Sequence, residues 1–258
     1  MIRRMLLLLV FPLAMGHAQT AGEPEKPKLP PRSLRLLPLG EPPPFRQDIR
    51  DGVRYELEPA AGSIPPRQVR LGEGESPTLI RLNLGRATEP VKIPGGTVPA
   101  ILREAKATVD PAAKPWLTLH PPEAGNVLAL IWRNPGTQWD KPQSLILPDS
   151  AATFPAGSIR IVNLLPVETA LLIGAERVLL GPAKSLVKAI AIGTDLPLHI
   201  AFKNNLGQYQ RFYSGSILLN PNERAQIFTH RADGEKPRQP AKVVIFSEAA
   251  PPPPKPQP

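Results

Sequence analysis

The stretch FPAGSIRIVNLLPVETALLIGAERVLLGPAKS, residues Phe154–Ser185, decides the fold class. It contains short apolar runs, such as Ser158–Leu165 and Arg177–Leu180, which are separated by turn-forming residues. Apolar runs of about four to eight residues between turn formers predict β-strands. The stretch therefore predicts part of a β-sheet, in which Arg160 faces solvent and Asn163 lies in a turn.

The same pattern continues on both sides of this stretch. Residues Thr78–Leu84 alternate between apolar and polar side chains, and Asn126–Trp132 is a further short apolar run. Such runs recur about every 8–12 residues, as they do in antiparallel sandwiches and barrels. Residues Val98–Ala107 could form two helical turns, but strands and helices do not alternate as in a nucleotide-binding α/β fold. We therefore expect an all-β protein.

A weak internal repeat predicts how the strands are grouped. Ile80–Leu84 resembles Ile159–Asn163, and Lys242–Phe246 is a third similar strand. The intervening segments share an order of proline, strand, glycine-containing turn and strand. This repeat predicts two antiparallel immunoglobulin-like sandwich modules, residues 51–157 and 158–248, which are joined by a turn at residues 154–157.

Proline accounts for 36 of the 258 residues and is concentrated at the ends of the chain. Residues 19–50 form a proline-rich leader, and residues 249–258 form a proline-rich tail. Such segments favour extended polyproline-like conformations, so we expect proline-rich disordered ends. The tail could be a ligand for an aromatic groove, or it could be only a spacer.

The first 18 residues predict export. Arg3 and Arg4 precede the apolar run Met5–Met15, and small residues lead up to a cleavage site after Ala18. This pattern is typical of a signal peptide, and the run is shorter than the roughly 20 residues of a membrane span. An uncleaved anchor is the alternative. With no other long apolar run, we expect no integral membrane span after cleavage and a location in the periplasm or outside the cell.

Charge and cysteine content limit the partners. The chain has a net charge of +9 and no cysteine, which excludes disulfides and zinc–cysteine sites. For an exported protein, positive charge suits anionic polysaccharides, lipid head groups or peptidoglycan, or serves only solubility. No basic cluster is interleaved with aromatic residues, so we expect no nucleic-acid partner.

The sequence offers no pattern typical of catalysis. His120, His199 and His230 lack metal-ligand spacing, so we expect no metal and no cofactor. Tyr213–Ser216 is interpreted as a hairpin turn rather than a nucleophile motif, and no carboxylate pair is placed together by the sequence. We therefore expect a protein that is not an enzyme. A secreted hydrolase is the least supported alternative.

One aromatic residue stands out as a candidate for ligand binding. Trp139 lies in the polar segment NPGTQWDKPQ, where an exposed indole could stack on a sugar ring. Arg133 and Lys141 are basic residues on either side of it. Together the three residues form a hypothetical site for an anionic polysaccharide.

Four short motifs carry a resemblance to a known group of proteins. They are Glu41–Phe45, Gly62–Arg67, Pro148–Asp149 and Phe154–Asn163, and their combination resembles a group of uncharacterised exported bacterial β-sandwich proteins. The strand around Arg160 is also similar to small exported sandwich modules of exopolysaccharide machinery. The resemblance implies an envelope or matrix role and carries no catalytic residues.

These observations converge on a non-catalytic structural or binding component of the bacterial cell envelope or extracellular matrix. Its expected partner is an envelope protein. The alternative is an accessory protein that binds an anionic polysaccharide.

Overall fold

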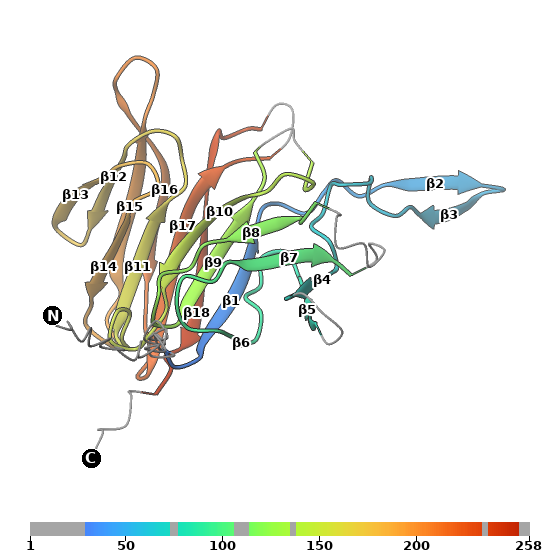
Figure 1. Cartoon of the computed structure of the whole chain (residues 1–258). Helices are drawn as coiled ribbons and strands as arrows, with labels where there is room; N and C mark the ends of the chain where they lie inside the picture. The colour runs from blue at the N-terminus through green and yellow to red at the C-terminus, as the bar shows by residue number, and fades with distance from the viewer. Residues whose placement is uncertain (1–28, 73–76, 106–113, 135–137, 234–236, 253–258) are drawn as a thin grey trace, which may run out of the picture.

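The structure is a computed structural model that describes residues 29–72, 77–105, 114–134, 138–233 and 237–252. Within these ranges the regular structure consists of strands and contains no helix, which confirms the predicted all-β class (Figure 1). The predicted helical turns at Val98–Ala107 are wrong, because strand β7 (Ala100–Glu104) occupies this segment. Its alternating residues Ala100 and Leu102 are buried in a core. The signal peptide lies outside the described residues.

The first module is built from two four-stranded sheets, in the orders β10-β9-β1-β6 and β5-β4-β7-β8. Its strands are β1 (Arg32–Leu39), β4 (Gln68–Leu71), β5 (Thr78–Arg81), β6 (Val91–Ile93), β7, β8 (Leu117–Leu119), β9 (Val127–Trp132) and β10 (Gln143–Pro148). A separate hairpin, β2 (Gln47–Arg50) and β3 (Val53–Glu56), is inserted between β1 and β4.

The second module also has two four-stranded sheets, in the orders β14-β11-β17-β18 and β13-β12-β15-β16. Its strands are β11 (Ser158–Asn163), β12 (Thr169–Ile173), β13 (Glu176–Leu180), β14 (Ser185–Ala189), β15 (Leu196–Lys203), β16 (Tyr209–Ile217), β17 (Glu223–Arg231) and β18 (Ala241–Ala249). The chain passes from one module to the other through residues 149–157.

The two modules have the same topology once the inserted hairpin is set aside. In each, the first strand pairs in parallel with the seventh, as β1 with β9 and β11 with β17. The flanking strands also correspond, so that β6 matches β14 and β10 matches β18. Ser33–Leu37 (SLRLL) therefore aligns with Ser158–Val162 (SIRIV). The chain is an internal duplication.

This correspondence corrects the predicted repeat. Ile80 lies in β5, which corresponds to β13, and Lys242 lies in β18, which corresponds to β10. Neither strand is therefore a counterpart of β11. The true counterpart, β1, lies inside residues 19–50, the segment predicted from the sequence to be a disordered leader. That assignment is wrong for residues 32–39, which form a central, buried strand, and for residues 47–50, which form strand β2.

The four large sheets are stacked as four layers, visible from left to right in Figure 1. One apolar core lies between the two sheets of the first module, and a second core lies between those of the second module. A third core lies between the modules, where sheet β10-β9-β1-β6 packs on sheet β14-β11-β17-β18. The inner strands are thus covered on both faces, which explains their nearly continuous apolar sequences.

Phe228 tests the importance of this third core. Its side chain is fully buried between the modules and touches the ring of Phe246, with centroids 5.8 Å apart. Phe228→Ala should lower the free energy of unfolding by about 3–5 kcal/mol, because it leaves a cavity in a packed interface. Denaturant titration measures this. Leu206→Ala, at an exposed position, is the control and should change stability by less than about 0.5 kcal/mol. Equal effects from the two variants would contradict the packing described above.

Candidate functional site

A cluster of buried and half-buried charges lies between the two modules beside the third core. Arg35 on β1 contacts two carboxylates, with Nη1 3.0 Å from Asp149 Oδ2 and Nη2 2.6 Å from Glu248 Oε2. Asp149 directly follows β10 in the first module, whereas Glu248 lies on β18 of the second. Arg35 therefore links the two modules.

Two further arginines complete this cluster from the second module. Arg224 donates to Asp149 Oδ1 at 2.8 Å and to Glu248 Oε1 at 3.0 Å. Arg160 donates to the carbonyl oxygen of Pro148 at 2.8 Å, and its Nη2 lies 3.4 Å from Asp149 Oδ1. Both guanidinium groups lie over the ring of Phe154, at 4.1 Å for Arg160 and 4.6 Å for Arg224.

The structure overturns the predicted roles of Arg160 and Asn163. Arg160 is only 2% exposed, because the face of β11 opposite its own core is covered by the first module. Asn163 is the last residue of β11, and it is fully buried. Its amide nitrogen donates to the carbonyl oxygens of Val167 and Leu180, at 2.8 and 2.9 Å. Both residues are structural.

The cluster follows the symmetry of the duplication. Arg35 and Arg160 occupy equivalent positions on β1 and β11, and Asp149 and Glu248 occupy equivalent positions after β10 and on β18. Arg35 binds the carboxylate of the second module, and Arg160 binds that of the first. Such reciprocal contacts define an isologous interface, as in a symmetric homodimer. The modules are therefore arranged like two subunits of a dimer within one chain.

Burial and ion pairing lower the pKa values of two groups in this cluster, Arg160 and Glu248. Desolvation lowers the pKa of Arg160 to about 10, so this side chain stays charged at neutral pH. Burial acts to raise the pKa of the Glu248 carboxyl, but the hydrogen bonds and charges of Arg35 and Arg224 lower it overall. A carboxyl with a depressed pKa stabilises the folded state above its unfolded-state pKa and loses this contribution as the pH falls through the folded-state value.

Glu248→Gln should therefore destabilise the protein in a pH-dependent way. We expect the free energy of unfolding at neutral pH to fall by about 2 kcal/mol, the typical value of a hydrogen bond to a charged group. The deficit should begin to shrink as the pH drops below 4.5, the ordinary pKa of the group, because the unfolded wild-type chain then takes up a proton at Glu248. It should vanish once the pH is also below the depressed pKa of folded wild type, where Glu248 is neutral in both states. Urea titrations at several pH values measure this. Glu58→Gln, which removes an exposed ion pair with Arg67, is the control and should cost little at any pH.

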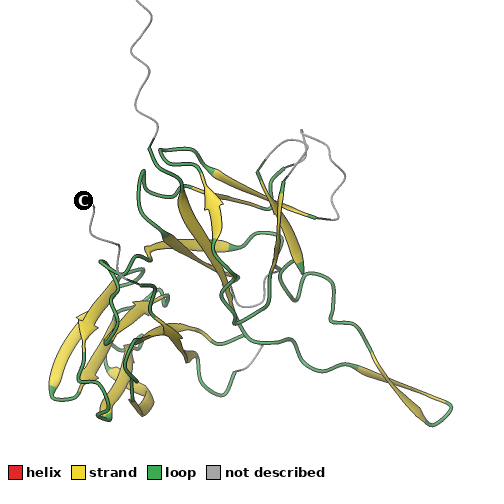
Figure 2. Cartoon of the chain, turned by 90° about the horizontal axis from the view of Figure 1, so that it is seen from below, coloured by secondary structure: helices red, strands yellow, loops and turns green. Residues whose placement is uncertain are grey.

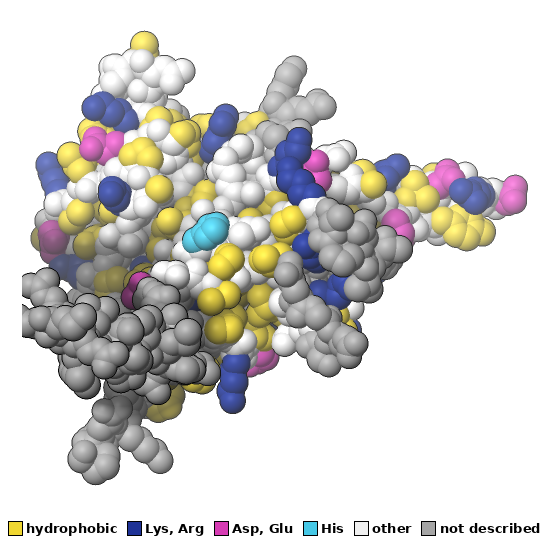
Figure 3. All heavy atoms as spheres, viewed as in Figure 1, with side chains coloured by type: hydrophobic (Ala, Val, Ile, Leu, Met, Phe, Trp, Pro, Cys, Tyr) yellow, Lys and Arg dark blue, Asp and Glu magenta, His cyan; other side chains and the backbone are white. Residues whose placement is uncertain are grey.

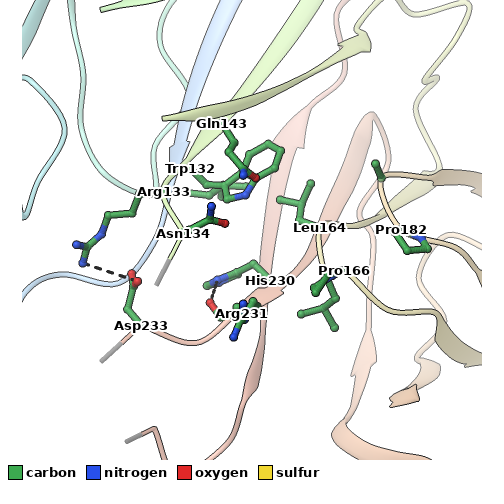
Figure 4. A pocket seen from close by; sticks show the side chains of 13 residues that line it. Trp132, Arg133, Asn134, Gln143, Leu164, Pro166, Pro182, His230, Arg231 and Asp233 are labelled. Carbon is green, nitrogen blue, oxygen red and sulfur yellow. Dashed lines mark hydrogen bonds and ion pairs between the residues drawn. The ribbon is translucent and has the colours of Figure 1, made fainter. Parts of the chain in front are cut away.

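A pocket of about 270 Å³ opens at one end of the junction between the modules (Figure 4). Six of its residues form three pairs that the duplication makes equivalent: Leu39 with Leu164, Trp132 with His230 and Arg133 with Arg231. The remaining lining residues are Asn134, Gln143, Leu165, Pro166, Pro182, Ala183 and Asp233. The pocket is thus lined by residues of both modules, and it has one polar and one apolar side.

The polar side of this pocket holds a histidine in a defined state. His230 Nδ1 lies 2.8 Å from the carbonyl oxygen of Arg231, an acceptor, so Nδ1 carries the proton. Desolvation lowers the pKa of His230, which keeps the ring neutral and leaves Nε2 as a hydrogen-bond acceptor. Nε2 has no partner within the described residues. Beside it, Arg133 Nη2 lies 3.7 Å from a carboxylate oxygen of Asp233.

The structure separates the three residues predicted to bind a polysaccharide. Trp139 is 2% exposed and lies in the core of the first module, where its carbonyl oxygen accepts a hydrogen bond from Trp116 Nε1 at 2.6 Å. Its ring cannot stack on a sugar, so the prediction for Trp139 is wrong. Arg133 lines the junction pocket, and Lys141 is exposed in the loop before β10.

The histidines form no metal-binding group within the described part of the chain. No cluster of three or more histidine and acidic side chains there could hold a metal ion. The predicted hairpin turn at Tyr213–Ser216 is wrong, since these residues lie in the middle of β16. Ser214 Oγ is 2.7 Å from Nδ1 of His199 on the adjacent strand. This is a cross-strand pair on the outer face of the sheet.

The most prominent feature of the surface was not predicted from the sequence. The hairpin β2–β3, here called the arm (residues 45–57), projects away from both modules in two perpendicular views (Figures 1 and 2). Four large apolar side chains on it are exposed, namely Phe45 (69%), Ile49 (60%), Val53 (53%) and Tyr55 (49%). Figure 3 shows apolar side chains on the arm among charged ones of both signs. The Asp51-Gly52 turn between two short strands is the sequence pattern that predicts it.

Hydrogen bonds and an ion pair fix both ends of the arm to the two modules. Before the arm, the main-chain nitrogen of Glu41 donates to Asp233 Oδ2 at 3.2 Å, and its carboxylate accepts from the main-chain nitrogen of Asp233 at 2.8 Å. The same carboxylate pairs with Lys242. After the arm, the carbonyl oxygen of Gly62 accepts from the main-chain nitrogen of Trp139 at 2.9 Å. Both ends of the projecting segment are therefore fixed.

A comparison with known protein families finds no family that matches this chain. No curated protein matches it either. The resemblance noted from the sequence thus stays a prediction. Within the described residues, no helix is long and apolar enough to cross a membrane.

Proposed function

We propose that this protein is a non-catalytic structural or binding component of the bacterial cell envelope or extracellular matrix. The observation that carries the proposal is the arm. Monomeric proteins rarely expose several large apolar side chains together unless these mark an interaction site. Phe45, Ile49, Val53 and Tyr55 are exposed on a hairpin whose two ends are fixed to the body.

The two stacked modules are suited to this role because they hold the arm in a fixed position. We propose that each module is immunoglobulin-like in its general architecture, with two sheets around one core, and that proline-rich ends extend from the pair. The strand order differs from that of an immunoglobulin constant-type domain, since the first and fourth strands of each module share one sheet and the second and fifth share the other. The immunoglobulin constant-type arrangement places all four in a single sheet. The predicted signal peptide would deliver this body to the periplasm or beyond.

A photo-crosslinking amino acid placed at Ile49 tests whether the arm binds a protein. In the native cell, irradiation should convert a large part of the chain into a larger covalent adduct, because the side chain at this position faces outward from the arm. Immunoblotting measures the adduct. The same amino acid at Leu206, which is 82% exposed on the loop between β15 and β16, is the control and should give none. An arm that yields no adduct would refute the proposed binding role.

A second candidate function is the binding of an anionic polysaccharide, and a different surface favours it. A groove of about 370 Å³ runs over the outer face of the β13-β12-β15-β16 sheet. Arg177 and Arg211 line it together with His199 and Tyr209. Two exposed guanidinium groups beside an aromatic ring suit the carboxylates and apolar ring faces of an acidic sugar. This surface replaces the site around Trp139 that the sequence predicted.

Arg211→Glu tests this second candidate. We expect retention on an immobilised anionic polysaccharide to weaken by about fivefold, since one exposed ion pair contributes up to about 1 kcal/mol. Arg67→Glu carries the same charge change at an exposed position on the other module, and it should affect retention less. Affinity chromatography at low salt measures both variants. If the two lose retention equally, binding reflects net charge and the groove has no specific role.

A further inference from the structure

We propose that the partner of the arm is a second copy of this chain, and that two arms join edge to edge through strand β3. This inference rests on the proposed binding function and names its partner. In the proposed dimer, the β3 strands of two copies pair antiparallel about a two-fold axis that passes between the two Tyr55 residues. The two hairpins then form one continuous four-stranded sheet.

The main-chain geometry leaves the outer edge of β3 ready for such pairing. Within the described residues, β3 pairs only with β2, in the register Arg50 with Val53 and Asp48 with Tyr55. In a hairpin with a two-residue turn, the pair that closes the turn is hydrogen-bonded and every second pair follows it. The hydrogen bond from Leu57 N to Arg46 O, at 2.9 Å, fits this alternation. The main-chain groups of Arg54 and Glu56 therefore point outward.

These outward groups are spaced correctly for a symmetric pair. With the two-fold axis at Tyr55, Arg54 of each copy lies opposite Glu56 of the other. Each of these pairs can form both main-chain hydrogen bonds of an antiparallel ladder. The two tyrosines then form the close, non-hydrogen-bonded pair, in which side chains approach most nearly. No main-chain donor or acceptor has to be buried without a partner.

The side chains of the segment Val53–Leu57 (VRYEL) are self-complementary in the same register. Arg54 faces Glu56, so each dimer gains two opposite-charge pairs, and Val53 faces Leu57, so each dimer gains two apolar pairs. Cross-strand pairs of these kinds stabilise antiparallel sheets. A different protein would have to supply this order of charges independently, whereas a second copy supplies it by symmetry.

The edge of β2 is less suited to the same contact. Asp48 already forms an ion pair with Arg50 of its own strand, at 2.8 Å. A two-fold axis at Ile49 would place Gln47 opposite Asp51, a turn residue with a positive φ of 51°. A two-stranded hairpin alone is also marginally stable, and pairing through β3 gives it the third and fourth strands that an independent sheet needs.

Charge reversal and charge exchange on β3 test the proposal. Sedimentation velocity of the full-length protein over a range of concentrations measures the dimer dissociation constant. Wild type should dimerise. Arg54→Glu should raise the constant by about tenfold or more, because it places two carboxylates opposite each other at both symmetric positions. The double variant Arg54→Glu/Glu56→Arg should restore dimerisation, because opposite charges face each other again.

Matched controls separate this contact from general effects of charge. Arg46→Glu makes the same charge change at the base of the arm, outside the paired segment, and should leave the dimer intact. All of these positions are exposed, so the unfolding midpoint should not move when it is measured at a protein concentration at which every variant is monomeric. A monomeric wild type, or an Arg54→Glu variant that dimerises as wild type does, would overturn the proposal. Should crosslinking from Ile49 still trap a different protein in that case, the binding role of the arm would stand and only self-association would be wrong.

Discussion

Three arginines and two carboxylates, buried or half-buried between the inner sheets, hold the modules in one arrangement. Arg35 and Arg160 lie on the outward faces of the two equivalent strands, β1 and β11. A lone module would carry its arginine on an otherwise apolar sheet face, without the carboxylate of the other module. Burying an unpaired charge is costly, whereas each arginine here meets a carboxylate across the junction. The charges therefore favour one way of stacking the sheets.

Burial of apolar side chains at the junction drives the two inner sheets together, and the charged cluster selects how they are oriented. Buried ion pairs often add little net stability compared with apolar side chains, because desolvation offsets their attraction. Leu130, Val162 and Phe228 form the adjacent apolar contact and bring the sheets together without directional preference. The position of the arm follows from this division of roles. Glu41, at its base, bonds to Asp233 in the second module, so the arm keeps its direction only while the modules stay stacked.

The alternation of apolar and polar residues predicted the strands of the second module but not what covers their outer faces. Arg160 alternates with Ile159 and Ile161, so its position outside its own core was predictable. That a second sheet lies on this face depends on contacts with β1 and β9, which are distant in sequence. β1 itself was missed because prolines at positions 30, 31 and 38 mimic an extended leader. Trp139 was misplaced because its neighbours are polar, while its own ring turns back into the core.

The inserted hairpin occurs in only one of the two equivalent modules, and this asymmetry sets the valency of the chain. If both modules carried the hairpin, each chain would present two strand edges able to pair with another chain. Chains with two such edges link into open filaments of unlimited length, as heterologous or bivalent contacts do. With a single arm, each chain has a valency of one for contacts made through it. Because the hairpin is present in one module and not in its equivalent, association through the proposed contact would end at a pair of chains.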